Sequence, residues 1–213
     1  MARITKGILG GFSGKVGTIV GANWRGQDII RSIPKPSSKQ PSERQLLQQV
    51  KFKLVIGFLQ PVKNIQTKYF GSGSGSKSRV NMAVSYTINE AIQMNGDIPE
   101  LMYNKVLITK GDLAGFQNVT VVPQAGNILQ LNWENNSAQG NADPADKANM
   151  VCYCEELGTF EIFEAVAERS VLTTEVTLPN YYAGKEVQVW AFFRNEKETV
   201  ACNSAYLGVQ TLI

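Results

Sequence analysis

The chain has 213 residues, of which 43% are hydrophobic and 18% charged, a composition typical of one or two globular domains with enough apolar material for a core. It contains no histidine, which excludes Ser-His-Asp and Cys-His catalysis and histidine-ligated metal sites. No apolar run approaches the roughly 18 residues that a membrane-spanning helix needs.

Charge is distributed unevenly along the chain. Residues 1–80 contain 14 Lys and Arg against Asp28 and Glu43, a net charge of +12, whereas residues 81–213 contain 7 Lys and Arg against 16 Asp and Glu, a net charge of −9. Such asymmetry indicates a nucleic acid, a membrane surface or an acidic protein surface as partner. The acidic surface can be the second half of a neighbouring copy.

The N-terminus and the cysteines indicate where the chain works. The first apolar run is short and interrupted by glycine, so we expect no cleaved Sec signal and place the chain in the cytoplasm, or in a particle assembled there. Three cysteines cannot form a complete disulfide framework. Cys152 and Cys154 lie two apart on a predicted strand, and we expect buried free thiols, with a metal or redox pair as the alternative.

Glycine recurs through residues 7–34, the segment around which we interpret the rest of the chain. Val, Ile and Trp fall between the glycines and favour a pleated, half-buried surface, while glycine permits bends and close backbone approach. The pattern predicts a β-ribbon with one arm near 15–20, a bend through 21–26 and a second arm near 27–33. A two-stranded ribbon is marginally stable in water, so it must pack on its own chain or on a neighbour.

A proline-rich linker and a helical region are predicted next. Three prolines in residues 33–41 favour a stiff, extended linker, which we bound at 35–41. Ser42 and Gln45 form a capping-box pattern, and apolar residues at helical spacing predict a helix to Pro61, with a second piece over 62–70. After a Gly-Ser loop, periodicity predicts a helix over 79–94 and a strand over 105–109.

From Phe116 onward, short β-rich runs alternate with turn signals. The seven runs cover residues 119–122, 128–133, 148–154, 160–165, 171–178, 186–193 and 200–209. Their number and spacing are typical of a β-sandwich. The predicted fold class is therefore α+β, with four parts: an N-terminal β-ribbon arm (1–34), the linker (35–41), a small helical region with a strand (42–115) and an all-β immunoglobulin- or fibronectin-like sandwich (116–213).

Two resemblances follow from particular motifs. Trp133, Tyr153, the Leu178-Pro179 pair and the Val-x-Val-x-Ala run at 187–191 resemble a fibronectin type III domain. In that family a Tyr usually lies where Lys185 stands, and Tyr181 or Tyr182 can take its place. This resemblance implies a sandwich that presents or spaces surfaces, without catalysis.

The whole chain also resembles an uncharacterised bacterial family of about this size. The resemblance rests on Ile-Leu-Gly-Gly-Phe-Ser-Gly-Lys-Val-Gly-Thr at 8–18, Trp-x-Gly at 24–26 and Arg-Ser-x-Pro at 31–34, and it extends to the Lys-Gly-Asp-Leu at 110–113. It supplies an identity for the chain but no activity.

Motifs for small-molecule chemistry are incomplete. The glycine-rich segment at 10–18 resembles a phosphate loop, but it lacks the first glycine and the Ser/Thr after Lys15 that would bind magnesium. The acidic run formed by Glu155, Glu156 and positions 161, 164 and 168 could supply a glycosidase pair, although a solvated strand face is the simpler interpretation. Tyr181, Tyr182 and Trp190 could form a sugar-binding platform, although packing in the core is favoured. We therefore expect no enzyme activity and no cofactor.

The predicted function is structural: a non-enzymatic protein that self-assembles through its N-terminal ribbon, as in a phage-type or other repeating bacterial assembly. The expected assembly residues are apolar or basic and are Phe12, Lys15, Val16, Ile19, Trp24, Arg25, Ile29 and Arg31. Two alternatives stay open, a nucleic-acid-binding protein using the basic first 80 residues and a carbohydrate-binding sandwich. The alternative without a binding role for the ribbon is a basic solvated face with Trp24 in a core.

Overall fold

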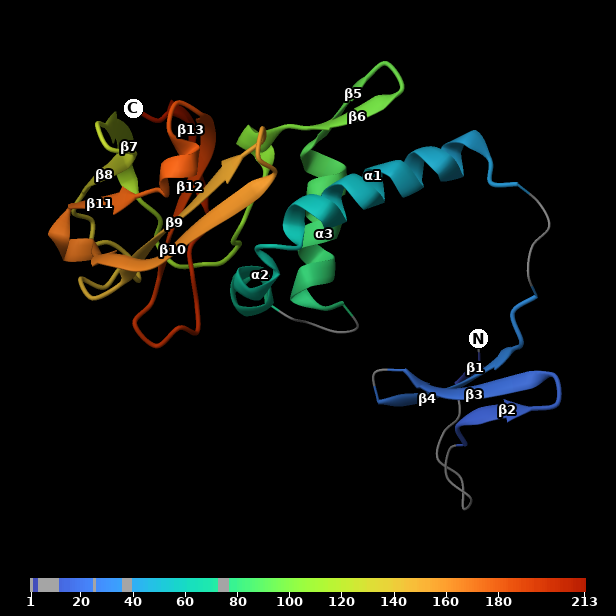
Figure 1. Cartoon of the computed structure of the whole chain (residues 1–213). Coiled ribbons are helices and arrows are strands. Elements are labelled where there is room, and N and C mark those ends of the chain that lie inside the picture. The colour runs from blue at the N-terminus through green and yellow to red at the C-terminus, as the bar shows by residue number, and fades with distance from the viewer. Residues whose placement is uncertain (1, 4–11, 25, 36–39, 73–76) are drawn as a thin grey trace. The chain divides into compact units, whose positions relative to one another are not determined.

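Figure 1 shows the computed structural model of the chain, which describes residues 2–3, 12–24, 26–35, 40–72 and 77–213. The fold is mixed, with helices and antiparallel sheets. The chain divides into two compact units, Met1–Gln45 and Leu46–Ile213, each described here by itself. Within the described ranges, no helix is long and apolar enough to cross a membrane.

The first unit contains a small antiparallel sheet, which we call the N-terminal sheet, with strand order β1-β4-β3-β2. Its strands are β1 (Ala2–Arg3), β2 (Gly14–Val16), β3 (Ile19–Trp24) and β4 (Gln27–Ser32). The second predicted arm, near 27–33, matches β4, but the single arm near 15–20 and the bend through 21–26 are wrong. Gly17, with a φ of +56°, begins a two-residue turn between paired Val16 and Ile19, so residues 21–24 continue a strand.

The second unit begins with three helices, α1 (Glu43–Leu59), α2 (Lys63–Tyr69) and α3 (Arg79–Glu90). The first residues of α1 precede Leu46, where the second unit begins. The predicted capping box is confirmed, because the Ser42 N–H donates to Gln45 Oε1 at 2.9 Å and the Gln45 N–H donates to Ser42 Oγ at 3.4 Å. The predicted break at Pro61 is confirmed as well, since α1 ends at Leu59 and α2 begins two residues after the proline.

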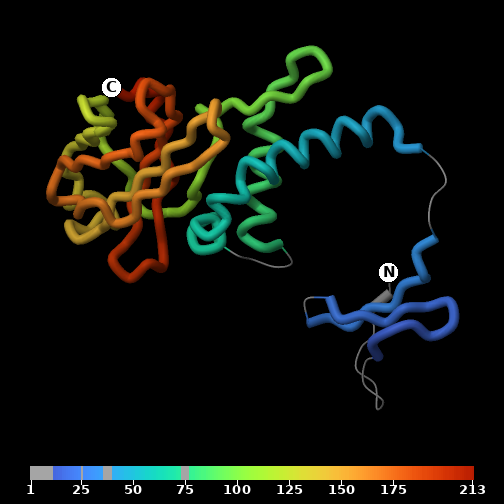
Figure 2. The backbone as a smooth tube through the Cα atoms, viewed as in Figure 1, coloured from blue at the N-terminus to red at the C-terminus, as the bar shows by residue number. Residues whose placement is uncertain are grey.

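The helix predicted over 79–94 is four residues too long. It ends at Glu90, and the chain then forms a hairpin of β5 (Ile92–Asn95) and β6 (Ile98–Leu101) before it enters the sandwich (Figure 2). Gly96, with a φ of +61°, lies in the two-residue turn between paired Asn95 and Ile98. The two turn residues are Gly96 and Asp97, and Gly-Asp between two strands is a hairpin signal that here overrides the helical spacing of the apolar residues.

The strand predicted over 105–109 is also not formed. Residues 103–105 make a 3-10 turn, and the following backbone is held by side chains rather than by a ladder. The Ile108 N–H donates to Ser204 Oγ at 2.8 Å, and Thr109 Oγ1 donates to the Cys202 carbonyl at 2.8 Å. The Ser204 hydroxyl thus accepts from the backbone N–H groups of both Ile108 and Thr109, and the Cys202 carbonyl holds the Thr109 side chain.

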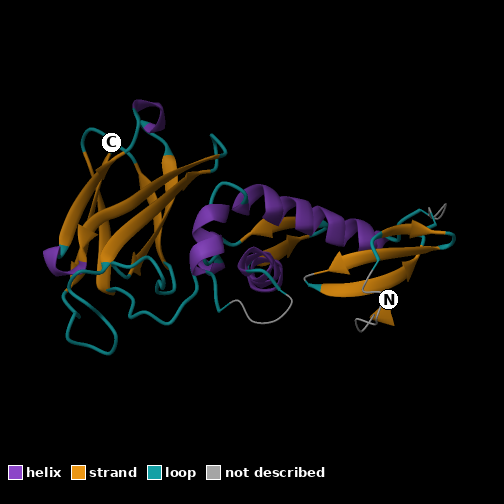
Figure 3. Cartoon of the chain, turned by 90° about the horizontal axis from the view of Figure 1, so that it is seen from below, coloured by secondary structure: helices purple, strands orange, loops and turns teal. Residues whose placement is uncertain are grey.

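Seven strands form the predicted β-sandwich (Figure 3). They are β7 (Gln117–Gln124), β8 (Ile128–Glu134), β9 (Lys147–Cys154), β10 (Thr159–Glu168), β11 (Thr173–Thr177), β12 (Glu186–Arg194) and β13 (Ala205–Thr211). One sheet has the order β11-β8-β7 and the other β10-β9-β12-β13. This three-plus-four arrangement is fibronectin-like, and each predicted run overlaps one strand.

The sandwich core lies between the two sheets. Leu129, Leu131 and Trp133 alternate with less buried residues along β8, the period expected for a strand with one buried face. Trp133 meets Phe193 of β12 edge to face at 5.8 Å between ring centroids. The Trp and the Val-x-Val-x-Ala run that carry the fibronectin resemblance are thus core positions.

The outer face of the four-stranded sheet is covered by the helical region. Along β12, both faces are buried, which is unusual for a sandwich strand with one face in water. Trp190 is fully buried there, and its Nε1–H donates to the Val106 carbonyl at 3.2 Å. Phe58 of α1 packs against Tyr153 and Phe160 at centroid distances of 5.0 and 5.1 Å. Helices and sandwich share one hydrophobic cluster.

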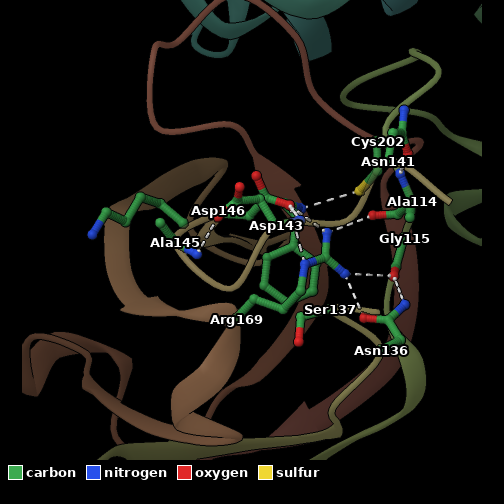
Figure 4. Close-up of polar contacts among 12 residues, drawn as sticks. Ala114, Gly115, Asn136, Ser137, Asn141, Asp143, Ala145, Asp146, Arg169 and Cys202 are labelled. Carbon is green, nitrogen blue, oxygen red and sulfur yellow. Dashed lines mark hydrogen bonds and ion pairs between the residues drawn. The ribbon is translucent and has the colours of Figure 1, made fainter. Parts of the chain in front are cut away.

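A buried arginine joins the loops at one end of the sandwich (Figure 4). Arg169 is fully buried, and both Nε and Nη2 donate to Asp146 Oδ2, at 3.1 and 3.0 Å. Nη1 donates to Asn136 Oδ1 at 2.6 Å, and Nη2 also donates to the Ala114 carbonyl at 2.7 Å. The guanidinium lies over the Phe193 ring at 3.9 Å. Its charge is therefore both paired and hydrogen-bonded.

All three cysteines are free and buried, as expected from the sequence. Burial raises the pKa of the Cys152 thiol, and it raises that of Cys202 to about 11. Both thiols are thus protonated near neutral pH, which makes them poor nucleophiles and poor metal ligands. Among the described residues, no group of three or more Cys, Asp or Glu is arranged to hold a metal ion.

Candidate assembly surface on the N-terminal sheet

Strand register divides the predicted assembly residues between two faces of the N-terminal sheet. Opposite residues on paired strands share a face, and successive residues alternate. Lys15 pairs with Val20, which pairs with Arg31, so these three lie in one row, while Val16 and Ile19 form the next row on the opposite face. We call the face with Lys15 and Arg31 the basic face and the face with Val16 and Ile19 the apolar face.

The apolar face is built around Gly21. A Cβ added at Gly21 would lie 2.4 Å from the Phe12 carbonyl oxygen and 2.6 Å from its ring atom Cε2. Phe12 therefore occupies space that only glycine leaves open. Beside it, Val16 is 60% and Ile19 38% exposed, so apolar surface continues into solvent.

We expect Gly21→Ala to displace Phe12 and to destabilise the N-terminal sheet, because the nearest obstruction is backbone and cannot rotate away. The cost should be about 1–3 kcal/mol, the usual range for overpacking. Hydrogen exchange of the amides of residues 14–32 measures it.

Gly57→Ala is the matched control, since nothing lies within 4 Å of a Cβ at that helical position. It should stabilise α1 by about 0.5–1 kcal/mol through backbone entropy. Unchanged exchange in the N-terminal sheet of Gly21→Ala would contradict the packing of Phe12 on Gly21.

The basic face combines cations with an aromatic ring. Lys15 and Arg31 flank Val20, and Ala22 pairs with Ile29 in the middle of the face. Trp24 stands at the end of β3 and is 47% exposed, so the alternative that buries it in a core is wrong. Arg25, the remaining predicted assembly residue, lies outside the described residues.

The described residues of this unit form almost no hydrophobic core. Among its described residues, Ile29 is the one buried hydrophobic side chain, at 7% exposure. The strands are only two to six residues long. A sheet of this size usually needs a packed apolar face to be stable.

The sheet also has open edges among the described strands. β2 is an end strand, and all three of its residues are exposed. β1 pairs with β4 only at Ile29 and Ile30, so most of the other edge of β4 has no described partner. Unpaired N–H and C=O groups along an edge are a template for strand addition.

The sequence pattern indicates the segment that forms this sheet but does not separate its two faces. The alternation along β3 and β4 was visible in the sequence, but a misplaced bend at 21–26 puts the strands out of register. A one-residue shift moves every side chain to the other face. Register therefore had to come from the structure.

The aromatic platform considered for sugar binding is not formed, and the core packing that the sequence favours is found for two of its three residues. Trp190 and Tyr182 are fully buried, and Tyr181 alone is exposed. The Tyr181 hydroxyl donates to Glu161 Oε1 at 2.6 Å, and this hydrogen bond is the main reason that its pKa rises to about 12. Side chains that are buried in the core cannot also face a sugar, so these three residues form no carbohydrate-binding surface.

The acidic run considered for glycosidase chemistry is largely engaged in surface pairs. Glu168 pairs with Lys147 at 2.7 Å and Glu156 pairs with Lys185. Glu161 accepts from both neighbouring tyrosines. These contacts fit the interpretation of a solvated strand face.

Fold and surface together define a class of protein: a small antiparallel sheet with open edges among its described strands, followed by a fibronectin-like sandwich in which helices cover the outer face of the four-stranded sheet. The chain belongs to DUF6266, a family of unknown function that matches residues 11–208. The family resemblance read from the N-terminal motif is thereby confirmed.

Other comparisons are sparse. No curated protein was found to match this chain by sequence. Among solved structures, a similar one is the fn3 domain of human collagen alpha-1(XX) chain, which is 14% identical, with 46% of this chain and 85% of that chain covered and a TM-score of 0.34.

Proposed function

We propose that this chain is a non-enzymatic structural protein that assembles with copies of itself through its N-terminal sheet, in a phage-type or other repeating bacterial assembly. The observation that carries the proposal is the composition of this sheet. It buries a single described hydrophobic residue, Ile29, while Val16 and Ile19 on the apolar face stay exposed. Packing of a neighbour against this surface would supply the missing core.

The proposal also assigns roles to the parts of the chain. The arm (1–34) makes contact with a neighbour, the linker (35–41) spaces it, and the helical region (42–115) with the sandwich (116–213) forms the body. Unlike charges favour contact between the arm of one copy and the body of the next. Such a heterologous contact repeats into rings or filaments. The assembly would form in the cytoplasm, without a cofactor.

We expect Ile19→Lys to weaken self-association at least tenfold, because it places a charge in the apolar face where a neighbour would pack. Sedimentation velocity of the full chain over a concentration series measures the change. Val122→Lys is the matched control, since Val122 is an exposed strand residue of the sandwich with 46% exposure. A wild-type chain that is monomeric at all salt and protein concentrations would overturn the proposal.

A second candidate function is nucleic-acid binding by the basic face. Lys15, Arg31 and Trp24 share this face, so cations and an aromatic ring point the same way, as in surfaces that bind single strands. Fluorescence anisotropy with labelled DNA and RNA at low salt tests it. The binding should fall steeply with salt and in Lys15→Gln/Arg31→Gln. No binding at low salt would remove this candidate.

A further inference from the structure

A pocket of about 510 Å³ lies between α1, β6 and β9, far in sequence from the N-terminal sheet. Its lining includes an aromatic group, Phe58, Tyr103 and Tyr153, and two carboxylates, Glu100 and Glu155. We call it the aromatic-acidic pocket. The rings pack closely, with centroids 5.0 Å apart for Phe58 and Tyr153 and 5.7 Å apart for Tyr103 and Tyr153.

The chemistry of this lining suits a cation. Ring faces attract cations through their quadrupole, and adjacent carboxylates add charge attraction. Burial is the largest cause that raises the pKa of both Tyr103 and Tyr153, and Glu155 raises it further. Both hydroxyls therefore stay protonated near neutral pH, and the negative charge of the pocket belongs to its glutamates.

These glutamates have no cationic partner among the described residues. Glu100 accepts a hydrogen bond from Asn95 Nδ2 at 3.0 Å, and neither Glu100 nor Glu155 takes part in an ion pair of the described chain. The adjacent Glu156, by contrast, is paired with Lys185. The pocket is thus open to a cation from outside the second unit.

We propose that the aromatic-acidic pocket accepts a lysine or arginine side chain from the basic face of the N-terminal sheet of a second copy. Charge complementarity favours this occupant: residues 1–45 contain 8 Lys and Arg against 2 acidic residues, whereas residues 46–213 contain 13 against 16. Lys15 on the end strand β2 and Arg31 on β4 are both exposed. The inference rests on the proposed self-assembly and names the surface that receives the arm.

The first test compares two double variants of the full chain by sedimentation velocity. Glu100→Gln/Glu155→Gln should weaken self-association at least tenfold. Glu134→Gln/Glu175→Gln removes the same charge from exposed positions on the three-stranded sheet and should leave it within twofold. Equal effects of the two variants would overturn the pocket but leave the proposed self-assembly standing. A monomeric wild type would overturn both.

A mixing experiment tests the direction of the contact. In Glu155→Lys the basic face is intact, but a positive charge blocks the pocket. In Lys15→Glu/Arg31→Glu the pocket is intact, but the charge of the basic face is reversed. Each variant alone should be monomeric, and an equimolar mixture should form a 1:1 pair that cannot extend. A mixture that stays monomeric would contradict the docking of a basic face in this pocket.

A small probe tests the pocket without assembly. Argininamide, titrated into the Lys15→Glu/Arg31→Glu variant, should change the fluorescence of Trp190, whose ring centroid lies 6.3 Å from that of Tyr103. The change should saturate and should be lost when Glu100→Gln/Glu155→Gln is added to the same chain. A linear response in both chains would count against a cation site.

Discussion

Replacing Arg169 with methionine is expected to lower the free energy of unfolding of the second unit by about 3–5 kcal/mol. The guanidinium is fully buried, and its loss would leave the Asp146 carboxylate, 1% exposed, as an uncompensated charge. Asn136 Oδ1 and the Ala114 carbonyl would lose a donor at the same time. Denaturation by guanidinium chloride, followed by far-UV circular dichroism, measures the change.

Lys147→Met is the matched control for this prediction. Lys147 pairs with Glu168 at 2.7 Å, but the two side chains are 27% and 49% exposed. An ion pair that water can reach contributes about 0–1 kcal/mol, so this variant should unfold close to the wild type. Similar losses in Arg169→Met and Lys147→Met would show that the buried network is not what holds these loops.

The second large effect is expected for Trp190→Ala, which should lower the free energy of unfolding by about 3–5 kcal/mol. Trp190 is fully buried between the four-stranded sheet and the helical region. Its ring lies 6.3 Å from Phe58 of α1 and 5.4 Å from Tyr206 of β13, measured between centroids. The substitution would leave a cavity lined by both parts, so helices and strands should lose stability together.

Trp24→Ala makes the same chemical change in a half-exposed residue of the other unit. It should leave unfolding of the second unit within about 0.5 kcal/mol of the wild type. Thermal unfolding, followed by circular dichroism at wavelengths dominated by helix and by strand, shows whether helices and sandwich lose stability together. If Trp190→Ala melted the helices while the sandwich kept its stability, the shared core described above would be contradicted.

Local patterns determined much of this protein. The sequence was sufficient to predict the capping box of Ser42 and Gln45 and the helix end before Pro61, because both depend on residues within one or two helical turns. It was also sufficient to predict the seven sandwich strands, because these follow from strand alternation. The free cysteines followed from their odd number and spacing. The β-rich character of the N-terminal segment was recognisable from its glycines and the apolar residues between them.

Other features depended on partners distant in sequence. Residues 92–95 form a strand because a turn at Gly96 folds the chain back. Residues 105–109 do not, because the Ser204 hydroxyl accepts from the backbone N–H groups of Ile108 and Thr109. Nothing in the sequence indicates that Arg169 is buried, because the groups that pair with its charge and accept its hydrogen bonds lie up to 55 residues away. The faces of the N-terminal sheet and the aromatic-acidic pocket likewise exist only once strands are in register. Sequence by itself determines the hydrogen bonds and apolar contacts that each segment can make with its own neighbours along the chain. The tertiary structure decides which distant groups pair with the remaining polar groups and cover the remaining apolar surface.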